Sequence, residues 1–62
     1  MNERECIQEA FESRIKLIFV SFLQSYNDAQ GNVAKEKTAE DAFRNGIAFS
    51  RRVRDRALAL LP

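Results

Sequence analysis

A run of nine residues, Ile15 to Leu23 (IKLIFVSFL), constrains the fold of this chain more than any other stretch. Seven of the nine residues are large and apolar, and only Lys16 and Ser21 interrupt them. The run is too short to span a bilayer, which takes about 20 apolar residues. It is also too apolar for an ordinary surface helix, which carries a single apolar stripe. We therefore expect the run to be covered on more than one side.

The length of 62 residues allows one domain, residues 1–62. Chains this short usually need a disulfide, a metal, oligomerisation or unusually good helix packing to be stable. An internal disulfide is excluded because Cys6 is the single cysteine, and we interpret it as a small hydrophobe buried near a helix start. We expect no metal and no cofactor, since the chain has no histidine. We therefore expect oligomerisation to stabilise the chain.

The first helix is predicted over about residues 3–30. Asn2 followed by Glu5 resembles a capping box, which places the helix start near Glu3. Gly31 suits the position after a helix end, because glycine adopts the left-handed conformation without strain. Between these ends, apolar residues recur every three or four positions and define one helical face: Ile7, Phe11, Ile15, Ile18, Phe22, Tyr26 and Ala29.

The second helix is predicted over about residues 38–61, after a polar loop at about 31–37. Thr38 and Asp41 have the spacing of an N-cap pattern, although an earlier start near Val33 is the alternative. Gly46 lies on the expected inner face among other small residues. Because glycine weakens a helix, we expect a large side chain such as Phe11, Ile18 or Phe22 to pack closely against it.

These patterns predict an all-α fold, a two-helix antiparallel hairpin that dimerises into a four-helix bundle. A single hairpin would leave one flank of the run from Ile15 to Leu23 exposed, and a second copy would cover it. The predicted dimer interface consists of Ile15, Ile18, Phe19, Val20, Phe22 and Leu23.

In length and layout, this predicted dimer resembles the Rop-type plasmid copy-number proteins. It is similar, again in layout, to the small helical proteins by which phages and plasmids bind host regulators. The first resemblance implies RNA or DNA binding and the second implies a protein target. Neither rests on a shared motif, so no functional residue is carried over to this chain.

The net charge of +1 is unevenly distributed along the chain. Residues 1–30 hold five acids and three bases, whereas residues 31–62 hold seven bases and four acids. The candidate partner-binding residues lie on the outer face of the second helix: Arg44, Arg51, Arg52 and Arg56.

Three interpretations of the local arginine cluster Arg51, Arg52, Arg54 and Arg56 stay open: a solvated face, a dock for an acidic protein patch, and a contact to a phosphate backbone. The arginines fan around the helix, and no aromatic residue is interleaved with them for base stacking. The sequence therefore favours a protein partner over nucleic acid.

We expect no enzymatic activity and no small-molecule substrate, because the chain lacks histidine, a P-loop and a dinucleotide-binding glycine pattern. The charged first residues do not resemble a signal peptide, so we expect a cytoplasmic protein without a membrane partner. The predicted function is that of a small interaction protein, a homodimer that binds another protein and regulates or inhibits it. The alternatives are a Rop-like RNA- or DNA-binding helical dimer and a structural assembly subunit.

Overall fold

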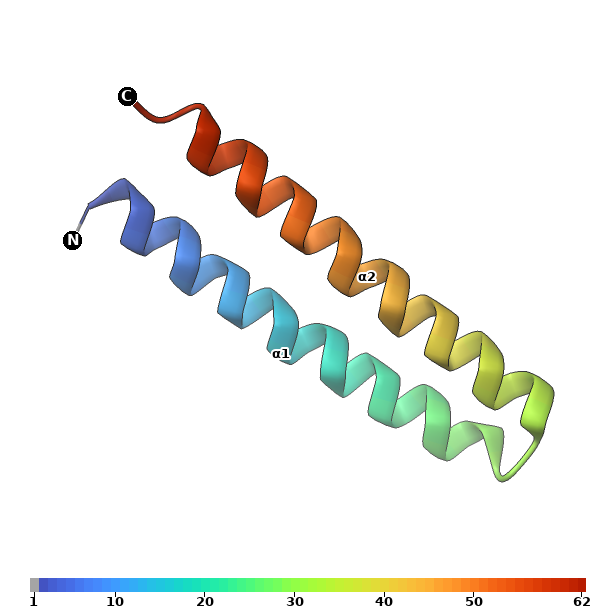
Figure 1. Cartoon of the computed structure of the whole chain (residues 1–62). Coiled ribbons are helices and arrows are strands. Elements are labelled where there is room, and N and C mark those ends of the chain that lie inside the picture. The colour runs from blue at the N-terminus through green and yellow to red at the C-terminus, as the bar shows by residue number, and fades with distance from the viewer. Residues whose placement is uncertain (1) are drawn as a thin grey trace.

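The computed structural model describes residues 2–62, and two helices account for most of them. Helix α1 spans Glu3–Ala29 and helix α2 spans Val33–Ala59. The helices lie side by side and run antiparallel, so that both chain ends are at the same end of the molecule (Figure 1). The Cα atoms extend over 48 × 18 × 6 Å, which makes the molecule a single flat layer. The prediction of an all-helical antiparallel hairpin is confirmed.

Helix α1 begins and ends close to where the sequence predicts. The Asn2 side chain accepts a hydrogen bond of 2.9 Å from the backbone N–H of Glu5, as the capping pattern indicates. After Ala29, the chain turns through two residues with positive φ, Gln30 at 49° and Gly31 at 80°. The turn is closed by the Asn32 N–H, which donates to the carbonyl oxygen of Ala29 at 2.9 Å.

Helix α2 starts earlier than predicted. The predicted loop over 31–37 and the helix start at Thr38 are wrong, and the alternative start near Val33 is right. Asn32 is the N-cap, because its side chain accepts a hydrogen bond of 3.0 Å from the backbone N–H of Lys35. Thr38 lies inside the helix instead, where its hydroxyl donates to the Ala34 carbonyl oxygen at 3.1 Å. The two helices are therefore of equal length, and residues 30–32 alone connect them.

The core between the two helices is thin. Its buried apolar residues are Ile18, Ala29 and Ala39, and among residues 2–62 no large side chain is fully buried. Ile18 lies against Gly46, which confirms the close approach expected at this glycine. Beside it, the Phe22 ring lies 4.8 Å from the Phe43 ring of α2, centroid to centroid. A core of this size leaves most large apolar side chains of the chain at the surface.

Candidate interaction surfaces

The middle of α1 is apolar almost all the way round, and α2 covers one side of it. Ile18 points at α2 and is buried, whereas Ile15 and Phe22 are half-buried at the edge of the helix pair. The residues that point further away keep between 49% and 59% of their accessible surface: Leu17, Phe19, Val20 and Leu23. Of the six predicted interface residues, the structure thus places Ile18 inside the hairpin and Phe19, Val20 and Leu23 on its outside.

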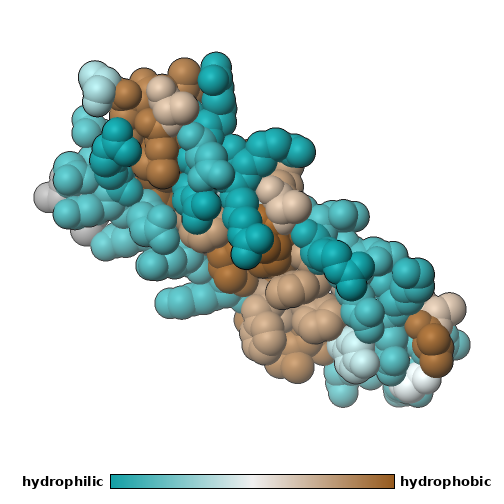
Figure 2. All heavy atoms as spheres, viewed as in Figure 1, coloured by the Kyte–Doolittle hydropathy of each residue, from teal (hydrophilic) through white to brown (hydrophobic). Residues whose placement is uncertain are grey.

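One surface, which we call the aromatic face, joins several of these side chains with residues of α2. It consists of Ile15, Phe19, Phe22, Leu23, Tyr26 and Phe43. Each of its α1 members lies three or four residues from another member, so together they form one patch on the helix surface. Phe22 is at its centre, with ring centroids 4.8 Å from Phe43 and 5.5 Å from Tyr26. Figure 2 shows hydrophobic atoms exposed between the two helices and over the middle of α1.

Acidic side chains border the aromatic face toward the turn of the hairpin. The negative charge of Glu36 raises the pKa of the Tyr26 phenol, and desolvation and the charge of Glu40 add to this effect. Glu40 and Arg44 also line an open hollow with Phe22, Tyr26 and Phe43. The aromatic face therefore has a polar rim on the α2 side.

The total accessible surface is large for a chain of this mass. It amounts to 4997 Å², which exceeds by about 900 Å² the value of about 4,100 Å² expected for a compact monomer. The excess arises because a single layer of two helices covers neither of its own broad faces. It is similar to the area of about 800 Å² that each partner buries in a standard protein interface.

A second apolar surface lies toward the chain ends, and we call it the terminal groove. It has a volume of about 320 Å³ and is lined mainly by apolar side chains of both helices. Its principal lining residues are Ile7, Ala10, Phe11 and Arg14 of α1 with Phe49, Val53, Arg54 and Ala57 of α2. Phe49 and Val53 are 57% and 50% exposed, so the groove is open to solvent.

The terminal groove opens on the opposite side of the flat hairpin from the aromatic face. Ile47 follows Phe43 by one helical turn and so continues the aromatic face along α2. Phe49 comes two residues later, and at 100° per residue these two side chains project about 160° apart. The hairpin thus presents one apolar surface on each of its broad sides.

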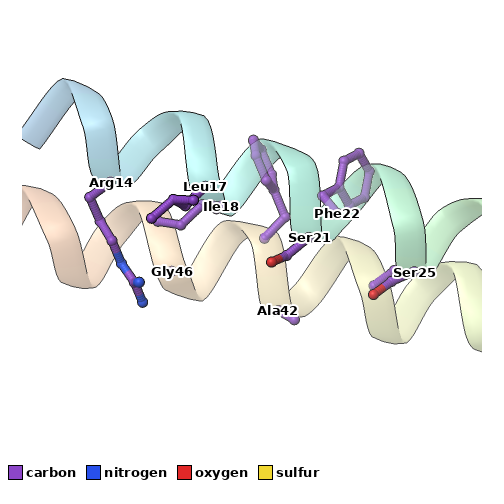
Figure 3. Close-up of a pocket in the computed structure, with 10 residues that line it drawn as sticks. Arg14, Leu17, Ile18, Ser21, Phe22, Ser25, Ala42 and Gly46 are labelled. Carbon is purple, nitrogen blue, oxygen red and sulfur yellow. The ribbon is translucent and has the colours of Figure 1, made fainter.

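A smaller hollow of about 220 Å³ adjoins the terminal groove toward the middle of the hairpin. The two share Arg14, whose side chain reaches from α1 toward α2 (Figure 3). Ser21, Ala42 and Gly46 line this hollow and leave room between the helices. Arg14 therefore lies where the two hollows adjoin.

The predicted partner-binding arginines do not form one cluster. Arg44 pairs with Asp41 at 3.2 Å, and Arg51 is exposed. The guanidinium carbon of Arg52 lies 5.5 Å from the centroid of the Phe49 ring, at the rim of the terminal groove. Arg56 is exposed one turn after Arg52. Neither Arg52 nor Arg56 lines the terminal groove itself, but the two share one face of α2, and Arg52 lies over the Phe49 ring that lines the groove.

Two arginines outside the four candidate partner-binding residues line the terminal groove: Arg54, which belongs to the local arginine cluster, and Arg14. The guanidinium carbon of Arg54 lies 4.3 Å from the Phe11 ring centroid, and its Nε lies 3.0 Å from an Asp55 carboxylate oxygen. Arg14 comes from α1, three residues after Phe11. No local sequence signal joins Arg14 to Arg54, because the two residues belong to different helices.

Other features of residues 2–62 bear on the chemistry of the chain. Cys6 is exposed, so its interpretation as a buried hydrophobe is wrong. Within the described range, no three or more side chains of the kinds that bind metals come together. Neither α1 nor α2 combines the length and the apolarity that crossing a bilayer requires.

Comparison of the chain with known protein families, with curated proteins and with solved structures finds no significant match.

Proposed function

We propose that this chain is a non-enzymatic interaction protein, which dimerises through its aromatic face into a four-helix bundle and regulates another protein by binding it. The observation that carries this proposal is the exposure of large side chains on both broad sides of the hairpin. Phe19 and Leu23 keep 53% and 56% of their surface on one side, and Phe49 keeps 57% on the other. Exposed apolar patches of this kind mark interaction sites in folded proteins.

A second copy is the occupant that best fits the aromatic face. The surface in excess of a compact monomer, about 900 Å², matches the area of about 800 Å² that each partner contributes to a standard interface. A twofold dimer places the same patch on both sides of the contact, so each aromatic face meets aromatic and aliphatic side chains. Antiparallel hairpins that pair in this way form a four-helix bundle.

Regulation by binding is the role that suits such a dimer. Two rod-shaped helices offer no enclosed site for a small molecule, and catalytic sites are typically concave pockets. Once the aromatic face is covered, the terminal groove and its arginines remain accessible on each copy. A dimer with two identical binding surfaces can sequester or inhibit a protein that it binds.

The oligomeric state tests this proposal most directly. We expect sedimentation velocity to give a dimer for the native chain at micromolar concentration. Leu23→Asp is expected to give a monomer, because dimerisation would bury an unpaired carboxylate. Val33→Asp is the matched control, since Val33 is 77% exposed at the start of α2, away from the aromatic face.

Three results would contradict the dimer. They are a native chain that sediments as a monomer, a Leu23→Asp variant that stays dimeric, and a Val33→Asp variant that dissociates as well. Circular dichroism of each variant shows whether the helices are retained, so that dissociation is distinguished from unfolding.

Exposed arginines favour the Rop-like nucleic-acid alternative as the second candidate. Recovery of the tagged protein from native lysate, with and without nuclease, separates the two. A stoichiometric protein partner that survives nuclease supports the proposal, and loss of the recovered material on nuclease treatment supports nucleic-acid binding. Recovery of the dimer alone supports a structural assembly subunit.

A further inference from the structure

We infer that the terminal groove binds an acidic amphipathic helix of a partner protein. The inference deepens the proposed function, on which it rests, by naming the site and the kind of partner. It is based on the juxtaposition of an open apolar floor, formed by both helices, with arginines from both helices at its edges.

The floor of the groove is apolar and is available in the dimer. Ile7, Ala10 and Phe11 supply it from α1, and Phe49, Val53 and Ala57 supply it from α2. Because the groove opens on the side opposite the aromatic face, the proposed dimer does not cover it. Binding of a complementary apolar surface displaces water from this floor, which lowers the free energy of the complex.

The edges of the groove carry positive charge. Arg14 and Arg54 line it, Arg52 lies over the Phe49 ring, and Arg56 follows Arg52 by one turn. Of the side chains found to line the groove, none is acidic. Within residues 2–62, Asp55 pairs with Arg54, whereas the ion pairs formed there involve none of Arg14, Arg52 and Arg56. A partner with carboxylates on both sides of an apolar stripe is therefore complementary in charge.

The partner segment is expected to be helical because the groove has no free backbone groups with which an extended peptide could form hydrogen bonds. Its walls are two helices whose backbone groups are already bonded within each helix. An extended peptide would find no strand edge to pair with, so its own backbone groups would stay unsatisfied. A helix satisfies its own backbone and packs its side chains into the furrow between two others.

The length of the groove sets the length of the contact. The α1 wall runs from Ile7 to Arg14, which at 1.5 Å per residue corresponds to about 11 Å, or two helical turns. A partner helix would therefore present apolar residues at positions i, i+3, i+4 and i+7, flanked by Glu or Asp.

Nucleic acid fits the groove less well. A phosphate backbone would take up the arginines but would leave Ile7, Ala10 and Val53 exposed to water. Base stacking requires aromatic platforms, and Phe49, the exposed aromatic residue of the groove, is already approached by Arg52.

Selection from a displayed peptide library tests the inference. The library consists of amphipathic helices with leucine fixed at i, i+3, i+4 and i+7 and every flanking position varied between Glu and Lys. We expect selection on the native protein to enrich Glu at the flanking positions. Enrichment of Lys, or no preference between Glu and Lys, would overturn the inference.

Variants of the groove locate the binding of the selected peptide, followed by fluorescence anisotropy. Arg52→Glu combined with Arg56→Glu should weaken binding by about tenfold or more, as for a reversed pair of interface charges. Phe49→Ala should cause a loss of similar size, since it removes an exposed aromatic anchor without opening a core cavity. The matched control, Lys35→Glu with Lys37→Glu, makes the same change in net charge at the other end of α2 and should leave affinity within about twofold.

Unchanged peptide affinity in both groove variants would overturn the assignment of the binding site to the terminal groove. An equal loss of affinity in the lysine control would overturn it as well. Displacement of the peptide from the groove by a short duplex RNA at comparable concentration would overturn the assignment of a protein partner. Sedimentation of every variant keeps the two proposals separate. A dimer that binds no acidic helix contradicts the groove alone, whereas a monomer that binds one contradicts the dimer alone.

Discussion

Ile18 of α1 lies directly against Gly46 of α2, with its Cδ1 and Cγ2 atoms 3.5 Å from the point that a Cβ at Gly46 would occupy. This distance is ordinary van der Waals contact, so alanine fits at Gly46 without displacing Ile18. Glycine inside a helix is less favourable than alanine by up to about 1 kcal/mol. We therefore expect Gly46→Ala to raise the free energy of unfolding by about 0.5–1 kcal/mol in urea denaturation.

A larger residue at the same position is the control for this prediction. Gly46→Leu adds three carbon atoms beyond the Cβ next to Ile18, and this overpacking should lower the free energy of unfolding by about 1–3 kcal/mol. If alanine also destabilises the protein, the two helices approach each other at Gly46 more closely than the structure has them.

The N-cap of α2 gives a prediction that depends on where this helix begins. Asn32→Ala removes the side-chain acceptor for the Lys35 N–H and should cost about 1 kcal/mol of stability. Thr38→Ala should cost nothing or stabilise slightly, because Thr38 lies within the helix and alanine is the better helix former. Thermal unfolding of both variants checks the pair. A larger loss at Thr38 than at Asn32 would move the helix start back to residue 38.

Local signals explain which parts of the fold could be predicted from the sequence. Periodic apolar residues and the cap at Asn2 identify α1 and its start, because each depends on neighbours in the chain. Asn32 and Thr38 both have the chemistry of an N-cap, so the sequence offers two starts for α2. The turn decides between them: positive φ at Gln30 and Gly31 reverses the chain within three residues, and α2 can begin at once.

The candidate surfaces depend on contacts between helices, which the sequence shows less directly than the ends of a helix. The apolar excess around Phe19, Val20 and Leu23 is visible in the sequence, because one narrow partner helix cannot cover it. Arg14 becomes part of the terminal groove through the register of α1 against α2, which composition does not reveal. The helical period of α2 makes Ile47 and Phe49 project about 160° apart and so divides the exposed apolar surface in two.

Titration of Tyr26, the single tyrosine of the chain, tests the electrostatics at the edge of the aromatic face. The charge of Glu36 is the largest cause that raises its pKa above the usual 10.0, ahead of desolvation and Glu40. Glu36→Gln should therefore lower the pKa of Tyr26, measured from the ultraviolet absorbance of tyrosinate. Glu9→Gln makes the same charge change on α1 and should leave this pKa where it is.

The raised pKa also predicts a dependence of stability on pH. The folded state holds the phenolic proton of Tyr26 more tightly than the unfolded chain does, so this proton contributes to the free energy of unfolding. The contribution is complete below pH 10.0 and is lost as the pH rises through the folded pKa. The free energy of unfolding should fall over this range more steeply for the native chain than for Tyr26→Phe. Equal slopes for the two proteins would show that Tyr26 has the same pKa folded and unfolded.

The contact of Arg54 with Phe11 should stabilise the hairpin more than that of Arg52 with Phe49. The guanidinium carbon lies 4.3 Å from the ring centroid in the first pair and 5.5 Å in the second. The Arg54 side chain is also 25% exposed, so the attraction of its cation to the ring is less screened by water. A double-mutant cycle with Arg54→Gln and Phe11→Leu should give a coupling of about 0.5–1 kcal/mol in urea denaturation.

The corresponding cycle with Arg52→Gln and Phe49→Leu is the control and should give a smaller coupling, because Phe49 is 57% exposed. Equal couplings, or a larger one for Arg52 and Phe49, would contradict the distinction between the two arginines. The expected order has a consequence for the terminal groove. If Arg52 contributes little to stability, the charges of Arg52 and Arg56 can be reversed without loss of the fold. A change in peptide binding on this charge reversal then reports on the terminal groove and not on unfolding.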